Sequence, residues 1–153
     1  MKALVTWYSR TGTTRAVGQA IARELGADSE EIVDLKKRTG LPPIRWLAAG
    51  RDAMRRKLTS IKFEKSPEGY DLIVIGTPTW AGNMAPAARS YLGSQKLDGK
   101  RVAFFCTGGG KDRIFKEMAE LAPKATVAGT LALAPEVVKR DRYVGSVKDF
   151  AEG

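Results

Sequence analysis

Residues 6–17 read TWYSRTGTTRAV, a stretch that begins like a β-strand and ends like an α-helix. Residues 3–8 are apolar and partly β-branched, which is typical of a strand buried on both faces. Apolar residues then recur over 14–25 at the spacing of an amphipathic helix, which Gly26 ends. Four hydroxyl side chains surround a glycine between the two patterns. This stretch therefore predicts a strand, a polar loop and a helix, the repeating unit of parallel sheets.

The alternation of strand and helix patterns continues along the chain. Further strand patterns occupy 30–34, 70–76, 101–106 and 126–133, and further helix patterns occupy 85–92, 112–121 and 144–151. Such alternation favours right-handed crossovers and a parallel sheet that helices cover on both faces. No internal repeat or low-complexity tract interrupts the pattern. We therefore expect one α/β domain over 1–153.

The composition excludes several kinds of chemistry. The 153 residues include no histidine, so the commonest general base and metal ligand is absent, and we expect no metal site. Cys106 is the only cysteine and cannot form an internal disulfide. Together with the lack of a secretory signal pattern and of an apolar run near the about 20 residues of a membrane span, this favours a cytoplasmic protein without a membrane span. Demanding chemistry would therefore come from a bound cofactor.

Three loops that follow strong strand patterns are rich in small and hydroxyl residues. They read SRTGTT at 9–14, TPTWAGN at 77–83 and TGGGKD at 107–112. In a parallel sheet, the loops after the strands lie along one edge, and ligands bind there at the point where the strand order reverses. We therefore expect these three loops to form one site.

The first loop has the composition of a phosphate site. A helix N-terminus offers unpaired amide groups and a partial positive charge, and Gly12 lets the backbone approach closely. The hydroxyls that could donate to phosphate oxygens belong to Ser9, Thr11, Thr13 and Thr14. The alternative is an ordinary N-cap, for which one hydroxyl suffices. Neither GxxxxGK[ST] nor a GxGxxG after a strand is present, which argues against a nucleoside triphosphatase and a Rossmann dinucleotide site.

The second and third loops are suited to an aromatic ring system. Trp80 lies between Pro78 and Gly82, so we expect an exposed indole at the sheet edge that can stack on a ring. The alternative is a tryptophan folded back as a lid on the core. The glycines at 108–110 would expose amide groups to the polar edge of a ring, although a flexible strand-to-helix connection is an equally simple explanation.

In order and spacing, these three loops resemble the flavin mononucleotide (FMN) loops of the flavodoxin family, and the resemblance covers nearly the whole chain. It implies a flavodoxin-like three-layer α/β/α sandwich, with a five-stranded parallel sheet of order 2-1-3-4-5 and one non-covalent FMN. The phosphate would be bound by Ser9, Arg10, Thr11, Gly12, Thr13 and Thr14. The ring would be flanked by Thr77, Pro78, Thr79, Trp80, Ala81 and Gly82 on one side and by Thr107, Gly108 and Gly109 on the other.

The resemblance implies an FMN-dependent redox protein and leaves its mode of action open. The lack of a recognisable NAD(P)H segment favours an electron carrier, with a redox partner protein and no catalytic side chain of its own. The third loop lacks a second stacking aromatic residue, which favours the alternative of an NAD(P)H-dependent quinone or flavin reductase. A further alternative is a non-enzymatic module that binds an anionic partner through basic residues.

Most of the positive charge lies in one segment. The chain has a formal net charge of +9, and residues 36–65 account for eight of these charges. The basic residues of this segment are Lys36, Lys37, Arg38, Arg45, Arg51, Arg55, Arg56, Lys57, Lys62 and Lys65. Apolar residues at helical spacing follow Pro42, so we expect an insertion with a basic amphipathic helix.

The basic helix has a plain explanation and several functional ones. As a crossover helix, it would simply cover one face of the sheet with its charges in solvent. The functional alternatives are docking of an acidic redox partner, a homodimer contact and a membrane-surface patch. Nucleic acid is the weakest of the alternatives and is not expected as a partner, because no RNA-binding motif or aromatic platform lies among the basic residues.

Three further positions lie near the predicted site. Cys106 ends a strand pattern before a glycine-rich loop, where a thiol pKa can fall. Small tyrosine phosphatases use C-x5-R, but Arg113 follows here after six intervening residues, so we expect a buried structural cysteine. Trp7 and Gly18 stand where flavodoxins usually have another aromatic residue and an alanine.

Overall fold

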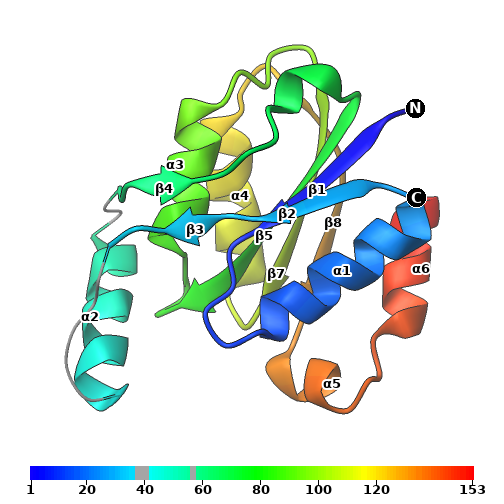
Figure 1. Ribbon diagram of the computed structural model, residues 1–153. Coiled ribbons are helices and arrows are strands. Elements are labelled where there is room, and N and C mark those ends of the chain that lie inside the picture. The colour runs from blue at the N-terminus through cyan, green and yellow to red at the C-terminus, as the bar shows by residue number, and fades with distance from the viewer. Residues whose placement is uncertain (37–41, 56–57) are drawn as a thin grey trace.

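The structure, a computed structural model, describes residues 1–36, 42–55 and 58–153 (Figure 1). Its centre is a parallel sheet with the strand order β2-β1-β5-β7-β8. The strands are β1 Ala3–Trp7, β2 Asp28–Glu31, β5 Leu72–Trp80, β7 Arg101–Thr107 and β8 Thr126–Leu133. Taken in chain order as five strands, this is the predicted order 2-1-3-4-5, so the predicted fold class is confirmed.

Helices cover both faces of the sheet, as Figure 1 shows. One face packs against α1 Thr13–Leu25, the short α5 Pro135–Lys139 and α6 Val144–Glu152. The other face packs against α3 Pro86–Ser94 and α4 Lys111–Leu121. Successive strand residues such as Leu4 and Val5 belong to different core clusters because side chains alternate along a strand. The central strands therefore have apolar side chains on both faces of the sheet, which explains their continuous apolar runs.

The prediction of one continuous strand at 30–34 is wrong, because two separate strands share these residues. The chain pairs with β1 as far as Glu31 and then leaves the main sheet, since β1 itself ends at Trp7. Its continuation, β3 Val33–Asp34, pairs antiparallel with β4 Ile61–Lys62 in a separate two-stranded sheet. A 3-10 turn, η1 Pro67–Gly69, then leads into β5.

The predicted basic helix is present as α2 Pro42–Met54, which stands at one side of the molecule (Figure 1, cyan). Ala49 and Ala53 are its buried apolar residues, and buried Asp52 forms an ion pair with Lys36. Of the basic residues predicted in this insertion, Lys37, Arg38, Arg56 and Lys57 lie outside the described residues. In the part of the chain that the structure describes, no helix is long and apolar enough to cross a membrane.

Trp7 and Gly18 fit together in the core. A Cβ atom built on Gly18 would lie 2.3 Å from the ring of Trp7, much closer than two carbon atoms can approach. The large indole on β1 therefore requires the absence of a side chain at this position of α1. Trp7 and Gly18 therefore depend on each other sterically.

A buried ion pair joins the two helices on the other face. Arg89 of α3 donates from Nη2 to Oε2 of Glu117 on α4 at 2.8 Å, and both side chains are almost fully buried. Arg113, one turn before Glu117, donates to the other carboxylate oxygen at 3.3 Å. Because a buried charge is costly without a partner, this arrangement fixes α3 against α4.

Candidate functional site

The three predicted loops meet at the carboxyl edge of the sheet. Thr14 of the first loop and Thr107 of the third share a buried hydrogen bond, with 2.8 Å between their hydroxyl oxygens. Arg10 of the first loop places its guanidinium over the ring of Trp80 in the second, 4.6 Å from the ring centroid. These contacts join loops that lie up to 93 residues apart in the chain. The structure therefore brings the three segments together as the sequence predicts.

A depression of about 370 Å³ lies between these loops. This volume falls within the range of about 300–1,000 Å³ that is typical of small-molecule sites. The predicted residues that line it are Arg10, Thr11, Thr13, Thr14, Pro78, Thr79, Trp80 and Thr107. Two other residues that line it, Pro135 and Lys139 of α5, were not predicted from the sequence. A five-residue helix is too short to show an apolar period, but a proline followed by a glutamate is a recognisable helix start.

The four hydroxyls of the first loop have different environments. Ser9 is buried, and its hydroxyl accepts a hydrogen bond from the backbone amide of Gly12 at 3.1 Å. Thr14 is buried and bonded to the third loop. Thr11 and Thr13 remain accessible and line the depression, with their hydroxyl oxygens 3.5 Å apart. Thr11 and Thr13 are therefore the hydroxyls available to a ligand, whereas the other two hold the loop in shape.

The N-terminus of α1 opens toward this loop without a side-chain cap. Its N-cap residue is Gly12, whose φ of 96° lies in the left-handed region that favours glycine. Glycine has no side chain that could cap the amide groups of the first turn, and the amide of Gly12 itself donates to the Ser9 hydroxyl. Two basic residues, Arg10 and Lys139, also line the depression, with the guanidinium of Arg10 over the ring of Trp80. Uncapped amides in a depression with two basic residues are suited to an anion.

The predicted second loop is shorter than expected, because β5 continues as far as Trp80. Ala81 and Gly82, with φ values of 50° and 73°, turn the chain back into β6 Asn83–Met84. β6 pairs antiparallel with the end of β5, which makes a hairpin with a two-residue turn. The Asn83 side-chain amide donates to the Ala81 carbonyl at 2.8 Å and holds this turn.

Trp80 is not the exposed platform that the sequence predicted. Its side chain is only 7% exposed, because Ala49 and Ala53 of α2 pack against it. Tyr8 meets it edge to face, with 5.5 Å between ring centroids, and Arg10 lies over its ring. The indole still lines the depression, so it is both part of a small apolar cluster and part of the wall of the site.

The third loop packs closely on the second. A Cβ atom on Gly108, whose φ is 129°, would lie 2.6 Å from the Thr79 side chain. A Cβ atom on Gly110 would lie 3.1 Å from the Gly82 carbonyl oxygen. Gly109 lies between these two contacts, where an added Cβ would meet no atom within 4 Å. At Gly108 and Gly110 the absence of side chains lets the loops touch, which a merely flexible connection would not need.

Cys106 lies in the core beneath this loop. Its side chain is almost fully buried, as the sequence analysis predicted. Burial raises the pKa of the Cys106 thiol to about 11, against smaller opposing effects of Thr79 and Lys111. A thiol with this pKa is protonated at neutral pH and is a poor nucleophile.

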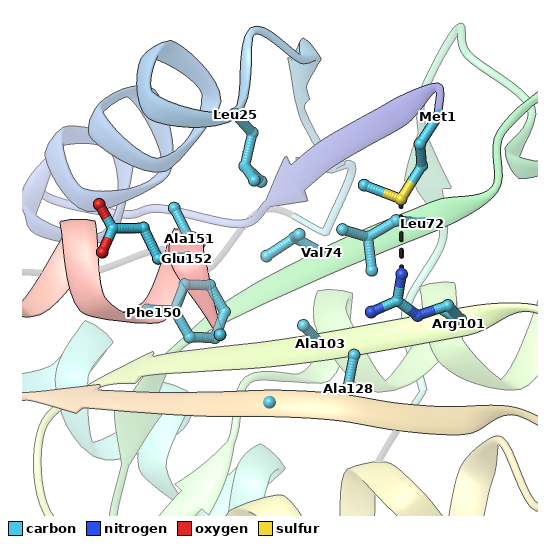
Figure 2. Close-up of a pocket in the computed structure, with 12 residues that line it drawn as sticks. Met1, Leu25, Leu72, Val74, Arg101, Ala103, Ala128, Phe150, Ala151 and Glu152 are labelled. Atoms are coloured by element: carbon cyan, nitrogen blue, oxygen red, sulfur yellow. Dashed lines mark hydrogen bonds between the residues drawn. The ribbon is translucent and has the colours of Figure 1, made fainter.

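A second cavity, of about 200 Å³, lies at the opposite edge of the sheet (Figure 2). It is bounded by the starts of the strands and by the ends of α1 and α6, with apolar walls that include Leu72, Val74 and Phe150. Arg101 donates to the sulfur of Met1 at 3.5 Å beside it. None of the predicted site residues lines this cavity, so it is separate from the site at the carboxyl edge.

Comparison with known proteins relates the whole chain to flavin proteins. A family model described as flavodoxin matches residues 2–141. An FMN complex of a flavoprotein from Lactobacillus acidophilus is 23% identical, with a TM-score of 0.74, over 93% of this chain and 97% of that one. Oxidised flavodoxin 2 from Bacillus cereus is 22% identical, with a TM-score of 0.60, over 99% and 96%. An apo NADH:FMN oxidoreductase is 12% identical, with a TM-score of 0.62, over 99% and 87%. At these identities the structural likeness concerns the fold.

Proposed function

The chain belongs to the flavodoxin family, and on that basis we propose that it binds one FMN non-covalently at the carboxyl edge of its sheet. The supporting observation is that one depression combines a polar end, suited to an anion, with an end that has an aromatic wall. One end has the uncapped N-terminus of α1 and two accessible threonines, and the other end has an indole with the guanidinium of Arg10 over it; Lys139 also lines the depression. FMN has the matching form, with a phosphate dianion at one end and a flat aromatic ring at the other.

The phosphate would lie at the N-terminus of α1. The first-turn amides, together with Thr11 and Thr13, would donate to its oxygens. Arg10 and Lys139 would balance its two negative charges, and this pair of cations fits a dianion better than a neutral ligand. Ser9, Gly12 and Thr14 complete the loop by keeping its backbone in this shape.

The ring would lie beside Trp80. Thr77, Pro78, Thr79, Ala81 and Gly82 would complete the wall on this side, and Thr107, Gly108 and Gly109 would form the other. Because Arg10 covers the indole in this structure, a ring that stacks on the same face would require the guanidinium to move away. The side chain is long enough to do so without a change in the backbone.

When bound, FMN would supply the redox chemistry, and the residues of the chain would bind it, orient it and exclude water from it. The favoured role is transfer of electrons to and from a redox partner protein, in keeping with the lack of a recognisable NAD(P)H segment. One observation favours the second candidate, an NAD(P)H-dependent quinone or flavin reductase. The third loop presents no aromatic side chain, so one side of the ring would be open to a substrate.

Titration of the purified protein with FMN and with riboflavin tests the cofactor. We expect one FMN per chain, much weaker binding of riboflavin, which lacks the phosphate, and quenching of tryptophan fluorescence by FMN. Failure to bind FMN, or equal affinity for the two flavins, would contradict the proposal.

Anaerobic reduction distinguishes the two redox roles. A carrier should be reduced by dithionite in two separated one-electron steps and only slowly by NADH or NADPH. Rapid reduction by either nucleotide, followed by reoxidation with a quinone, would establish the reductase instead.

A further inference from the structure

The helix α2 has its large apolar side chains on the outside. The side chains that it buries are small or charged, namely Ala49, Asp52 and Ala53. Leu47 and Met54, in contrast, are 74% and 63% exposed. A helix that only covers a protein core has the opposite arrangement, with its large apolar residues inward. The outer face of α2 is therefore suited to a contact outside this chain.

The surroundings of α2 are also apolar and basic. Seven of the ten exposed large apolar residues of the described chain lie in this region; they are Val33, Leu35, Ile44, Trp46, Leu47, Met54 and Leu58. Arg45, Arg51 and Arg55 are exposed along the helix, and among the described residues they form no ion pair. We call α2 together with these seven apolar residues the α2 patch. It combines an apolar centre with exposed guanidinium groups.

The charge of the molecule indicates what contacts this patch. Residues 36–65 carry eight of the nine net positive charges, so the rest of the chain is nearly neutral. An anionic surface would therefore attract the molecule in an orientation in which α2 faces that surface. A second copy of the chain would place these cations against each other, which is unfavourable.

The position of α2 also places its outer face outside the depression. The outer face lies on the opposite side of the helix from Ala49 and Ala53, which pack against Trp80. A partner seated on that face would be separated from the site by the thickness of a helix, about 10 Å. It would also leave the mouth of the depression uncovered.

We propose that the α2 patch binds the surface of a membrane that contains anionic lipids. Leu47 and Met54 would enter the boundary between headgroups and acyl chains, and Trp46 would lie at the level of the headgroups. The arginines would contact lipid phosphates while their aliphatic stems cover apolar surface. None of the residues that line the depression belongs to the patch, so this proposal holds with or without bound FMN.

Vesicle sedimentation tests the proposal. We expect the full-length protein to sediment with vesicles of phosphatidylcholine and phosphatidylserine in equal parts, and not with phosphatidylcholine alone. Binding should decrease as salt is added, because the attraction is screened. Emission of Trp46 should shift to the blue, and it serves as the reporter because Trp7 and Trp80 are buried.

Matched variants identify the surface. Leu47→Glu should weaken binding about tenfold or more, and Arg51→Gln with Arg55→Gln should weaken it about tenfold and reduce its salt dependence. Val144→Glu, and Arg142→Gln with Lys148→Gln, make matching changes of charge at exposed positions elsewhere and should have little effect. Circular dichroism and FMN titration verify that each variant is folded.

Several outcomes would overturn the proposal. Absence of binding to anionic vesicles at low salt would overturn it. An equal loss of vesicle binding in the α2 variants and in their controls would also overturn it. A dimer in light scattering that Leu47→Glu dissociates, without vesicle binding, would make a second copy the occupant. Association with an acidic redox protein that depends on Arg51 and Arg55, again without vesicle binding, would make that protein the occupant.

Discussion

The helices α1 and α2 have the same length of 13 residues and opposite arrangements of apolar side chains. α1 buries Val17 and Ile21 against the sheet, whereas α2 buries alanines and exposes Leu47 and Met54. Both sequences have apolar residues at helical spacing. The spacing shows that a helix has an apolar face, but it does not show whether this face meets the chain's own core or something else. The first helix packs along the sheet with large apolar residues, whereas the second covers only the end of β5 at Trp80 with alanines.

The largest difference between the two helices should be in how much the loss of a large apolar side chain from each one destabilises the protein. Ile21→Ala removes a fully buried side chain and should lower the free energy of unfolding by about 2–5 kcal/mol. Leu47→Ala changes an exposed side chain and should alter it by no more than about 0.5 kcal/mol. Urea denaturation followed by circular dichroism measures both. A large loss from Leu47→Ala would mean that the outer face of α2 packs against this chain, and the contrast would then be wrong.

The next largest effect should be on cofactor affinity, which involves α1 through its N-terminus. Thr11→Val and Thr13→Val each remove a hydroxyl from the depression and should weaken FMN binding by about 1.5–3 kcal/mol. Riboflavin binding should hardly change, because these hydroxyls are assigned to the phosphate. Calorimetric titration with both flavins gives the comparison. Equal losses for the two flavins would show damage to the loop rather than loss of phosphate contacts.

Trp80 connects the site with α2 and should show an effect of similar or smaller size. Trp80→Ala should weaken FMN binding by about 1–3 kcal/mol through loss of stacking and of buried apolar area. Trp80→Phe keeps an aromatic face and should lose less. Fluorescence of the wild type should recover when FMN is removed. An unchanged affinity in Trp80→Ala would assign the indole to the packing of α2 alone.

A glycine in each helix should give effects of similar or smaller size, and the signs of the two effects should differ. Gly18→Ala would press a Cβ atom into the ring of Trp7 and should destabilise the protein by about 1–3 kcal/mol, which Trp7→Phe should partly restore. Gly50→Ala has room, since its Cβ would lie 3.6 Å from that of Ala81, and should stabilise α2 by about 0.5–1 kcal/mol. Thermal denaturation of the variants measures both. A stabilising Gly18→Ala would mean that Trp7 can rotate away.

The features that the sequence predicts well are those with a local pattern. The apolar run that forms β5 predicts a parallel sheet, and the polar loops after its strands predict the edge at which the three loops meet, without knowledge of any contact. The strand order 2-1-3-4-5, which followed from the family resemblance, is confirmed as well.

The features that the sequence missed depend on distant contacts. The burial of Trp80 follows from alanines about 30 residues earlier in the chain, and nothing in TPTWAGN shows that they will pack there. Lys139 reaches the depression through a helix of five residues, which has no detectable period. Which hydroxyls of the first loop are accessible likewise depends on a distant residue, because Thr14 is bonded to Thr107 of β7.

The hydrogen bond between Thr14 and Thr107 has a consequence for the order of events in folding. These residues are 93 positions apart, so the chain must close a long loop before the two hydroxyls can meet. The depression is thus complete only after β7 has docked beside β5, and we expect this non-local step to come late in folding. A ligand that binds there stabilises the finished protein and not the transition state. Refolding should therefore proceed at the same rate with and without FMN, whereas unfolding should be slower by the factor that FMN adds to stability.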